Sequence, residues 1–402
     1  MMKKLITVTL LLLTIIPCLR AQRKEISQAR SYIKSGKDFA KAEQLLRGVM
    51  ANDSASGRDP RVHALLLQSI EKQYAEGNEK LYLRQKYDTT TFFVLTKKLF
   101  DVSWQLDSLD AIPDKKGRVK AKYRGRNAQM LNTCRPNLFY GGTYHLRKGN
   151  YRDAFELFDM YIQCMSHPMF GTFDYAKTDK RLSEAAYWAC YSATNLNNPD
   201  LVLKHDSLAE GDSTKLDYLL MYVAEAHLQK GDTSAYHTIL KRGFSQYPRF
   251  RYFFPHLMDY YTENGDYGSC LSLANEALSV DSTNILFLYA KANTLLSLGR
   301  NDECVEVSKR IIELNDTVAE AYYYIGMAIL NKIVAYEKAD ERQDKTQIKA
   351  LYKEAMPYLE NYRVLAPEEK KKWAPALYRV YLNLNMGKQF DDIDRIINEE
   401  KP

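Results

Sequence analysis

Apolar residues recur every three or four positions along most of this chain, the spacing that places them on one face of an α-helix. The stretch from Leu81 to Asp110 shows this clearly, with apolar residues at Phe92, Leu95, Leu99, Val102, Leu106 and Leu109. Polar segments containing glycine, proline or asparagine separate such stretches. The pattern predicts an all-α chain of amphipathic helices joined by short turns.

Three glycines, Gly231, Gly265 and Gly299, lie 34 residues apart, and each stands between two helix-like segments. Glycine enters the left-handed backbone conformation without strain, so it is the residue expected just after a helix ends. Asp232 and Asp266 follow the first two glycines, and an aspartate there can cap the next helix. The glycines therefore predict turns between paired helices.

This period resembles the tetratricopeptide repeat (TPR). The unit that begins at Arg135 matches the family best, with Gly142, Gly149, Tyr151, Ala154 and Phe158 at repeat positions 8, 15, 17, 20 and 24. Further units begin at Ser183, Asp217, Arg251, Ile285 and Ala319. The chain is similar to exported bacterial TPR proteins over 135–400, and only loosely over 22–134. The resemblance implies a superhelical solenoid of antiparallel helix pairs with a concave, ligand-binding groove.

The predicted organisation has three parts. Residues 1–21 are expected to be a cleaved signal peptide, and 22–134 an N-terminal helical region with a degenerate repeat and a basic loop. Residues 135–402 are expected to form the TPR array. A charged insertion near 337–349 either lengthens a helix or loops out of the stack.

The N-terminus has the features of an export signal. Lys3 and Lys4 precede an uncharged apolar run from Leu5 to Ile16, and Ala21 offers a cleavage site before Gln22. The run is too short to span a bilayer, which takes about 20 residues. We expect an exported protein, in the periplasm or at the periplasmic face of the outer membrane. A lipid anchor at Cys18 is disfavoured because proline precedes that cysteine.

Charge narrows the choice of partner only slightly. The net charge is +7, and loss of residues 1–21 removes three positive charges and no acid, leaving +4. One basic cluster stands out, comprising Lys115, Lys116, Arg118, Lys120, Lys122, Arg124 and Arg126. It is interpreted first as a solvated loop and second as a contact with an anionic membrane surface. Export makes nucleic acid a poor candidate partner.

Motifs for catalysis, metal binding or phosphate-loop binding do not occur in the sequence. His145 and His227 both fall at repeat position 11, where the family packs a large ring, and Cys270 and Cys304 fall at position 20, which takes a small residue. No Cys-x-x-Cys pair occurs, and disulfides stay open. We expect no cofactor, no metal and no enzymatic activity.

The resemblance also implies which residues line the groove, namely those at positions 2, 5, 9, 12 and 13 of the first helix of each repeat, and the candidates are taken from positions 2, 5 and 9. They are Phe139, Tyr218, Met221, Glu225, Tyr252, Asp259, Tyr289, Asn293, Tyr323 and Met327. Aromatic rings with a few amides and carboxylates suit an extended peptide. Packing between neighbouring helices would explain the tyrosines equally well, and both interpretations stay open.

The leading hypothesis is a non-enzymatic protein–protein interaction scaffold in the bacterial envelope, which binds a segment of a partner protein in the groove. One alternative is a peripheral membrane adaptor that uses the basic 115–126 loop. Another is an accessory subunit of an envelope uptake or assembly complex.

Overall fold

The computed structural model describes residues 22–339 and 345–399. These residues form helices and turns without a strand, which confirms the all-α prediction. Among them, no helix combines the length and the apolar character that crossing a membrane requires. The predicted signal peptide lies outside the described residues, as do residues 340–344 of the insertion.

The chain forms two compact units, one up to Gly231 and one from Asp232 onward. The first unit opens with a helix over 22–35. Its longer helices are then α2 (Phe39–Asn52), α4 (Pro60–Tyr82), α5 (Thr89–Asp110), α6 (Arg124–Cys134), α7 (Pro136–Arg147), α8 (Tyr151–Gln163), α10 (Leu182–Asn195) and α13 (Leu216–Gln229). Short helical turns connect them: α3 (Ser54–Gly57), η1 (Pro168–Phe170), α9 (Tyr175–Thr178), α11 (Pro199–Val202), α12 (Asp206–Ala209) and η2 (Ser213–Lys215).

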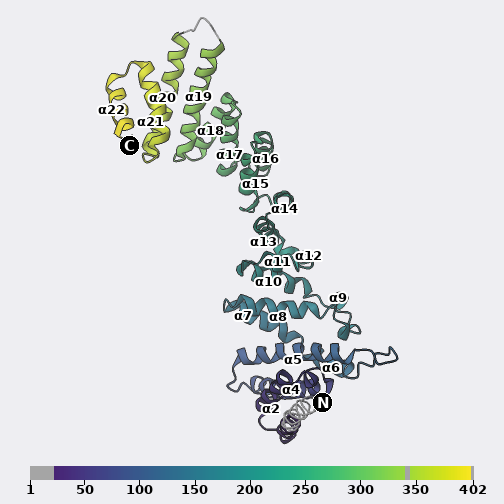
Figure 1. The fold of residues 1–402 in the computed structure, drawn as a ribbon. Helices are drawn as coiled ribbons and strands as arrows, with labels where there is room; N and C mark the ends of the chain where they lie inside the picture. Colours follow the sequence, from purple (N-terminus) through teal and green to yellow (C-terminus); the bar gives the residue numbers. More distant parts are fainter. Residues whose placement is uncertain (1–21, 340–344, 400–402) are drawn as a thin grey trace, which may run out of the picture. The chain divides into compact units, whose positions relative to one another are not determined.

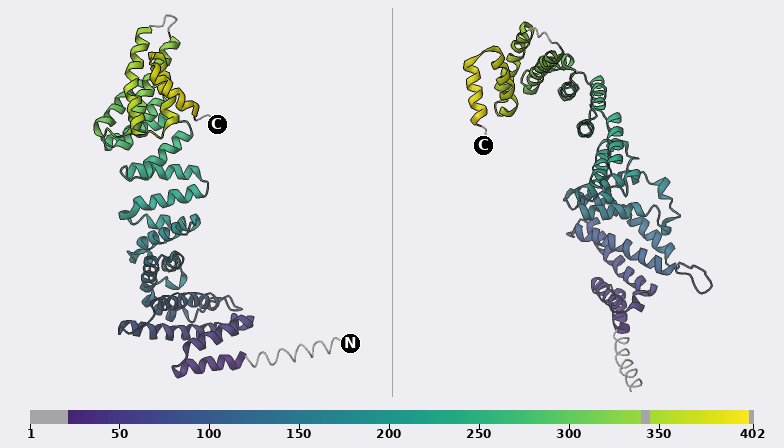
Figure 2. Two further views of the ribbon diagram at one scale, coloured as in Figure 1. Left: turned by 90° about the vertical axis from the view of Figure 1, so that its left-hand side faces the viewer. Right: turned by 45° about the horizontal axis from the view of Figure 1, so that its top comes forward.

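The second unit is more regular, and its successive helices pack against one another in antiparallel pairs (Figures 1 and 2). They are α14 (Thr233–Gln246), α15 (Phe253–Glu263), α16 (Tyr267–Val280), α17 (Ile285–Ser297), α18 (Asn301–Leu314), α19 (Ala319–Ala339), α20 (Lys345–Leu365), α21 (Lys370–Leu384) and α22 (Gly387–Glu399).

The three spaced glycines form the turns that the sequence predicts. Gly231, Gly265 and Gly299 have φ angles of 72°, 68° and 70°. Asp232 Oδ1 accepts the backbone N–H of Ala235 at 3.0 Å, and Asp266 Oδ1 accepts that of Ser269 at 3.0 Å. Both aspartates thus cap the following helix, as expected.

Small residues at repeat position 8 allow paired helices to approach closely. A Cβ atom on Gly142 would lie 2.7 Å from the Phe158 ring, and one on Gly326 would lie 2.5 Å from Leu359 Cδ2. Such distances leave no room for a side chain. Each glycine therefore fixes the packing of one pair, α7 on α8 and α19 on α20.

Two segments refine the predicted repeats. After α10, Asn197 makes the expected left-handed turn with a φ of 51°, but two short helices, α11 and α12, replace a full second helix. His205 Nε2 lies 2.7 Å from Asp159 Oδ1, which ties this segment sideways to α8. The insertion near 337–349 lengthens both flanking helices, because α19 and α20 each have 21 residues where α17 has 13.

A buried arginine organises the irregular segment between α8 and α10. Arg135 Nη1 donates to Asp179 Oδ2 at 2.6 Å, and Nη2 donates to the Tyr161 carbonyl at 3.1 Å. The guanidinium lies between two rings, 3.7 Å from the centroid of Tyr161 and 3.9 Å from that of Tyr175. The Tyr161 hydroxyl donates to the same Asp179 oxygen at 2.6 Å. This cluster anchors the segment to the start of α7.

Candidate functional site

The predicted groove residues of the second unit lie on or at the start of α15, α17 and α19, each of which is the first helix of a repeat. Residues at positions 2, 5 and 9 are three to seven apart, so on each helix they share one face. We call this set the first-helix face; it comprises Tyr252 at the N-cap of α15 with Pro255 and Asp259 on that helix, Leu286, Tyr289 and Asn293 on α17, and Glu320, Tyr323 and Met327 on α19. Asp259 and Asn293 are exposed.

A hollow of about 570 Å³ lies on this face between the N-terminal ends of α15 and α17. Pro255 and Leu286 contribute to its wall, together with Phe254 and Phe287, whose ring centroids are 4.6 Å apart. Leu286 is 47% exposed although it is a large aliphatic residue. The hollow therefore offers apolar surface that the unit itself leaves open to a ligand.

Charged groups flank the same hollow. Arg249 and Arg251 line it from the α14–α15 loop, and Asp281 lines it from the turn before α17. Arg249 Nη2 donates to the Val280 carbonyl at 3.5 Å, which holds that side chain across the inter-repeat turn. The arrangement places two cations and one acid beside an apolar surface.

The predicted tyrosines are more buried than a ligand-facing row would be. The Tyr289 ring lies 5.4 Å from the ring of Tyr324, and Tyr323 lies 4.9 Å from that of buried Tyr362. Both belong to the margins of apolar clusters, as does Met327. Tyr252 is half-buried and stacks on His256 at 4.1 Å. Packing between helices therefore accounts for much of the surface of Tyr289 and Tyr323.

The groove residues predicted in the first unit form a separate set. Tyr218 on α13 is 48% exposed, and Met221 and Glu225 on the same helix are half-buried. Phe139 requires a correction, because it is 7% exposed and its ring contacts Phe158 at 5.6 Å between centroids. It is a packing residue of α7, and we leave it out of the proposed binding surface.

Sequence reasoning missed Pro255, Leu286 and the two arginines as contributors to the site. The sequence did contain a signal for Pro255 and Leu286, since they occupy positions 5 and 2 of repeats whose register is set by the spaced glycines. The arginines lie in or next to an inter-repeat loop, where repeat position says little about orientation.

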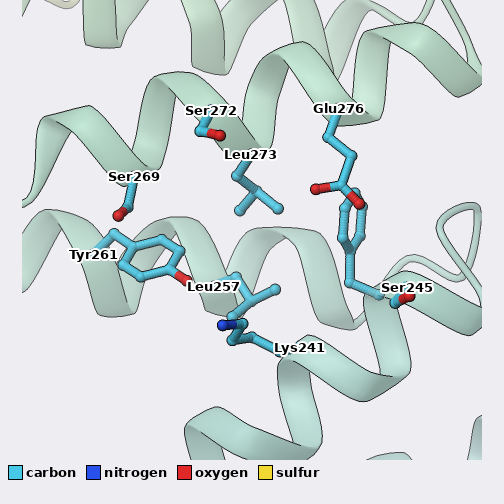
Figure 3. A pocket seen from close by; sticks show the side chains of 9 residues that line it. Lys241, Ser245, Leu257, Tyr261, Ser269, Ser272, Leu273 and Glu276 are labelled. Carbon is cyan, nitrogen blue, oxygen red and sulfur yellow. The ribbon is translucent and has the colours of Figure 1, made fainter.

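A second hollow, of about 380 Å³, lies between α14 and α16 over α15 (Figure 3). Lys241 and Glu276 line it together with Ser269 and Ser272. The Tyr261 hydroxyl at its edge lies 3.0 Å from His237 Nε2. Its residues come largely from second helices, so it is distinct from the first-helix face.

The predicted basic loop projects from the helices between α5 and α6 (Figures 1 and 2). The Asp114 carboxylate organises it, accepting the N–H groups of Lys116 at 2.8 Å and Arg118 at 3.1 Å and the Arg118 guanidinium at 2.9 Å. Hydrogen bonds from the Arg118 and Lys116 backbones, and from the Arg118 side chain, lower the pKa of Asp114. The loop therefore has a defined turn at its tip.

The predicted cations of this loop fall into two groups. Arg118, Arg124 and Arg126 pair with Asp114, Asp107 and Glu71, respectively. Lys115, Lys116, Lys120 and Lys122 are exposed, and within the described ranges they have no ion pair. Two aliphatic residues accompany them, Ile112 at 64% and Val119 at 52% exposure.

Candidate reactive groups prove to be buried. The five cysteines of the described chain are free and buried, and burial raises the pKa of Cys164 and Cys190 to about 12. His145 is 3% exposed, and burial lowers its pKa. Over residues 22–339 and 345–399, no group of three or more His, Cys, Asp or Glu could hold a metal ion.

No family model and no curated protein matches the chain. Solved structures similar to it are TPR proteins. The C-terminal part of a TPR repeat-containing protein from Cytophaga hutchinsonii has 13% identity and a TM-score of 0.44, covering 63% of this chain and 92% of that one. YrrB, described as a TPR protein with an unusual peptide-binding site, has 14% identity and a TM-score of 0.34, covering 49% and 93%. A TPR repeats protein from Bacteroides fragilis has 14% identity and a TM-score of 0.30, covering 65% and 98%.

Proposed function

We propose that this protein is a non-enzymatic scaffold that holds a segment of another protein on the first-helix face of its second unit. The observation that carries the proposal is the apolar hollow between α15 and α17, at positions 5 and 2 of consecutive repeats. A large aliphatic side chain left 47% exposed in such a hollow is available to a partner.

The chemistry of the face indicates what kind of segment fits. An apolar side chain of the partner would occupy the hollow against Leu286 and Phe254, and a neighbouring carboxylate would meet Arg249 and Arg251. Asn293 lies two turns along α17 from Leu286 and is exposed. A side-chain amide both donates and accepts hydrogen bonds, so it can pair with the backbone of an extended peptide.

Selection from a library of random 12-residue peptides tests this proposal. We expect the protein to enrich peptides that combine an apolar and an acidic residue. Leu286→Asp should weaken the binding of the enriched peptides at least tenfold. The substitution places a negative charge in the apolar hollow, next to the two arginines that would bind the acidic residue of the peptide.

The matched control for that variant is Leu314→Asp. Leu314 ends α18, is 36% exposed and lies outside the hollow, so its replacement should leave binding unchanged. Failure to enrich any peptide, or equal loss in both variants, would rule out this surface as the binding site.

The envelope location belongs to the same proposal and is supported by the basic residues and apolar run before Gln22. The mass of the protein isolated from its native cells provides the test. A chain that starts at Gln22 in the periplasmic fraction is expected, and an intact chain in the cytoplasm would contradict it.

A second candidate function, a peripheral membrane adaptor, is supported by the projecting loop. Ile112 and Val119 expose apolar surface among unpaired lysines, a combination that favours the surface of an anionic bilayer. Replacement of both by serine should reduce co-sedimentation with phosphatidylglycerol vesicles, and 0.5 M salt should abolish it. Binding that survives both changes would eliminate the loop as the contact.

A further inference from the structure

The first unit contains a cleft of about 600 Å³ whose walls are strongly basic. Arg30 comes from the helix over 22–35, Arg61 from the start of α4, and Lys122 and Arg126 from the end of the basic loop and the first turn of α6. Leu106 and other apolar side chains form part of the lining, and no carboxylate lies among the lining residues. By contrast, Lys241 in the hollow of Figure 3 shares that hollow with Glu276.

Two of the four cations, Arg61 and Arg126, pair with acids that do not line the cleft. Each of these guanidinium groups has further N–H donors that the ion pair does not use. Arg61 uses Nε and Nη2 toward Asp59. Arg126 gives only Nη2 to the two oxygens of Glu71, at 3.0 and 2.9 Å. In the part of the chain that the structure describes, Arg30 and Lys122 have no ion pair. The cleft thus has an excess of two positive charges.

A buried amide adds an independent sign of a ligand. Asn127 lines the same cleft and is 1% exposed, yet neither Nδ2 nor Oδ1 has a hydrogen-bond partner among the described residues. A buried amide without partners is costly, and natural structures retain few of them. A polar group that enters the cleft would provide the missing partner.

The start of α6 adds little to the positive charge of the cleft. This helix begins at Arg124 without a side-chain cap and with no acid in its first turn. Asp110 Oδ2 accepts the N–H of Tyr123, the residue that precedes the helix, at 2.8 Å, so a carboxylate already compensates part of the positive end of the helix dipole. The cations and Asn127, and not this helix end, therefore carry the case for an anionic ligand. Residues of this first turn line the cleft.

We infer that this cleft binds the phosphate group of a ligand that also carries a small apolar part. Cations converge from three separate segments, which suits the several oxygens of a tetrahedral phosphate, whereas a planar carboxylate is satisfied by a single guanidinium. The apolar lining accommodates the remainder of the ligand. The site lies wholly in the first unit and is independent of the peptide-binding proposal.

Titration calorimetry with the full chain tests the inference in two arms. The first arm uses glycerol 3-phosphate, and the second uses vesicles of phosphatidylglycerol. The double variant Arg30→Gln/Lys122→Gln removes the two cations without ion pairs, and both side chains are exposed, so the fold should persist. Lys370→Gln/Lys371→Gln, on exposed residues of α21, makes the same change of charge in the second unit.

Saturable one-to-one binding in at least one arm, weakened tenfold or more by the Arg30/Lys122 variant and unchanged in the control, supports the inference. Binding in the first arm identifies a soluble phosphate ester. Vesicle binding that Asn127→Leu also weakens identifies a lipid headgroup in the cleft, because contact through the exposed loop lysines does not involve buried Asn127. All chains share the apolar run from Leu5 to Ile16, so its own affinity for lipid cancels between variants.

A third variant, Asn127→Leu, separates recognition from stability. Leucine has the same number of side-chain heavy atoms and removes the unpartnered amide, so we expect an unchanged or higher Tm together with at least tenfold weaker binding. Absence of saturable binding in both arms, an equal loss in the control, or unchanged affinity in folded Asn127→Leu would overturn the inference.

Discussion

Replacement of Arg135 by methionine is the most informative test of how the irregular first unit is held together. The Arg135 side chain is 6% exposed and that of Asp179 is 11% exposed, so this is a buried ion pair. Methionine keeps an apolar stem of similar length between the rings of Tyr161 and Tyr175. The substitution therefore removes the charge and the hydrogen bonds more than the packing.

The expected cost follows from the groups that lose a partner. Removing one member of a buried pair costs about 3–5 kcal/mol, because the other charge stays buried without compensation. Here Asp179 keeps the Tyr161 hydroxyl at 2.6 Å and the Arg181 N–H at 2.9 Å. These donors favour the low end of that range, so we expect the free energy of unfolding to fall by about 3 kcal/mol.

Fluorescence can isolate this loss to the first unit. Trp104 and Trp188 lie in it, and Trp373 lies in the second unit. The Trp373 indole N–H has no hydrogen-bond partner within the described chain, so Trp373→Phe sacrifices no such bond. In that background, urea unfolding followed by tryptophan emission gives the stability of the first unit alone.

Two further measurements make the reasoning refutable. Hydrogen exchange over 165–181 should accelerate in Arg135→Met, because this segment loses its anchor. Arg152→Met removes an exposed arginine and should change stability by no more than about 0.5 kcal/mol. If Arg135→Met costs less than about 1 kcal/mol and leaves exchange over 165–181 unchanged, the cluster is not the anchor we describe.

Three further predictions concern the glycine turns, the stability at acidic pH and the accessibility of the thiols. Gly265→Ala should destabilise the second unit by about 1 kcal/mol in urea unfolding, because the φ of Gly265 is 68°. The control is Gly268→Ala, whose new Cβ would meet only Asp266 Oδ1 at 3.6 Å and which should be neutral or stabilising. Equal effects of the two variants would contradict the turn assignment. Burial would raise the pKa of Asp179, but hydrogen bonds from Tyr161, from the Arg181 backbone and from Arg135 outweigh burial and lower that pKa. The stability contributed by Asp179 is therefore complete above its unfolded pKa of about 3.9 and is lost as the pH falls below that value. In Asp179→Asn, the urea midpoint should depend less steeply on pH between about pH 2 and 5. Burial raises the pKa of Cys304 to about 11, and all five described thiols are buried; a thiol reagent at pH 8 should modify them only after unfolding, and fast reaction in the folded chain would show that the thiols are accessible.

The regular part of the fold was predictable because one physical requirement repeats there. Several helix pairs have a left-handed turn or a small residue at their closest contact, and residues such as Gly265 and Gly326 supply these at positions that the repeat sets. Local chemistry at one position therefore reports the architecture of a whole pair. Helix α5 was predictable for a similar reason, since its buried apolar residues recur at the period of the α-helix.

The candidate site was less predictable, because repeat position fixes the face of a residue but not its burial. Phe139 and Tyr323 hold groove positions, yet Phe139 packs on Phe158 and Tyr323 on Tyr362. Whether a ring at such a position meets solvent depends on the neighbouring helix. The cleft near Asn127 was predictable only in part: Lys122 and Arg126 belong to the basic cluster seen in the sequence, but Arg30 and Arg61 come from segments far away in the chain.

The two units achieve specific packing by different means, and this difference explains where perturbations should spread. In the first unit, departures from the repeat coincide with buried charges: Glu43 accepts from Arg47, Gln73 and Lys98, and Arg135 pairs with Asp179. In the second, pairs such as Arg300 with Glu303 lie at an exposed surface, and buried side chains such as Leu295 and Ile311 form the interior. A buried charge tolerates few alternative partners, whereas apolar side chains repack at modest cost. Loss of a single charge in the first unit should therefore release a defined segment, while loss of a single methylene in the second should lower the stability of a whole helix pair.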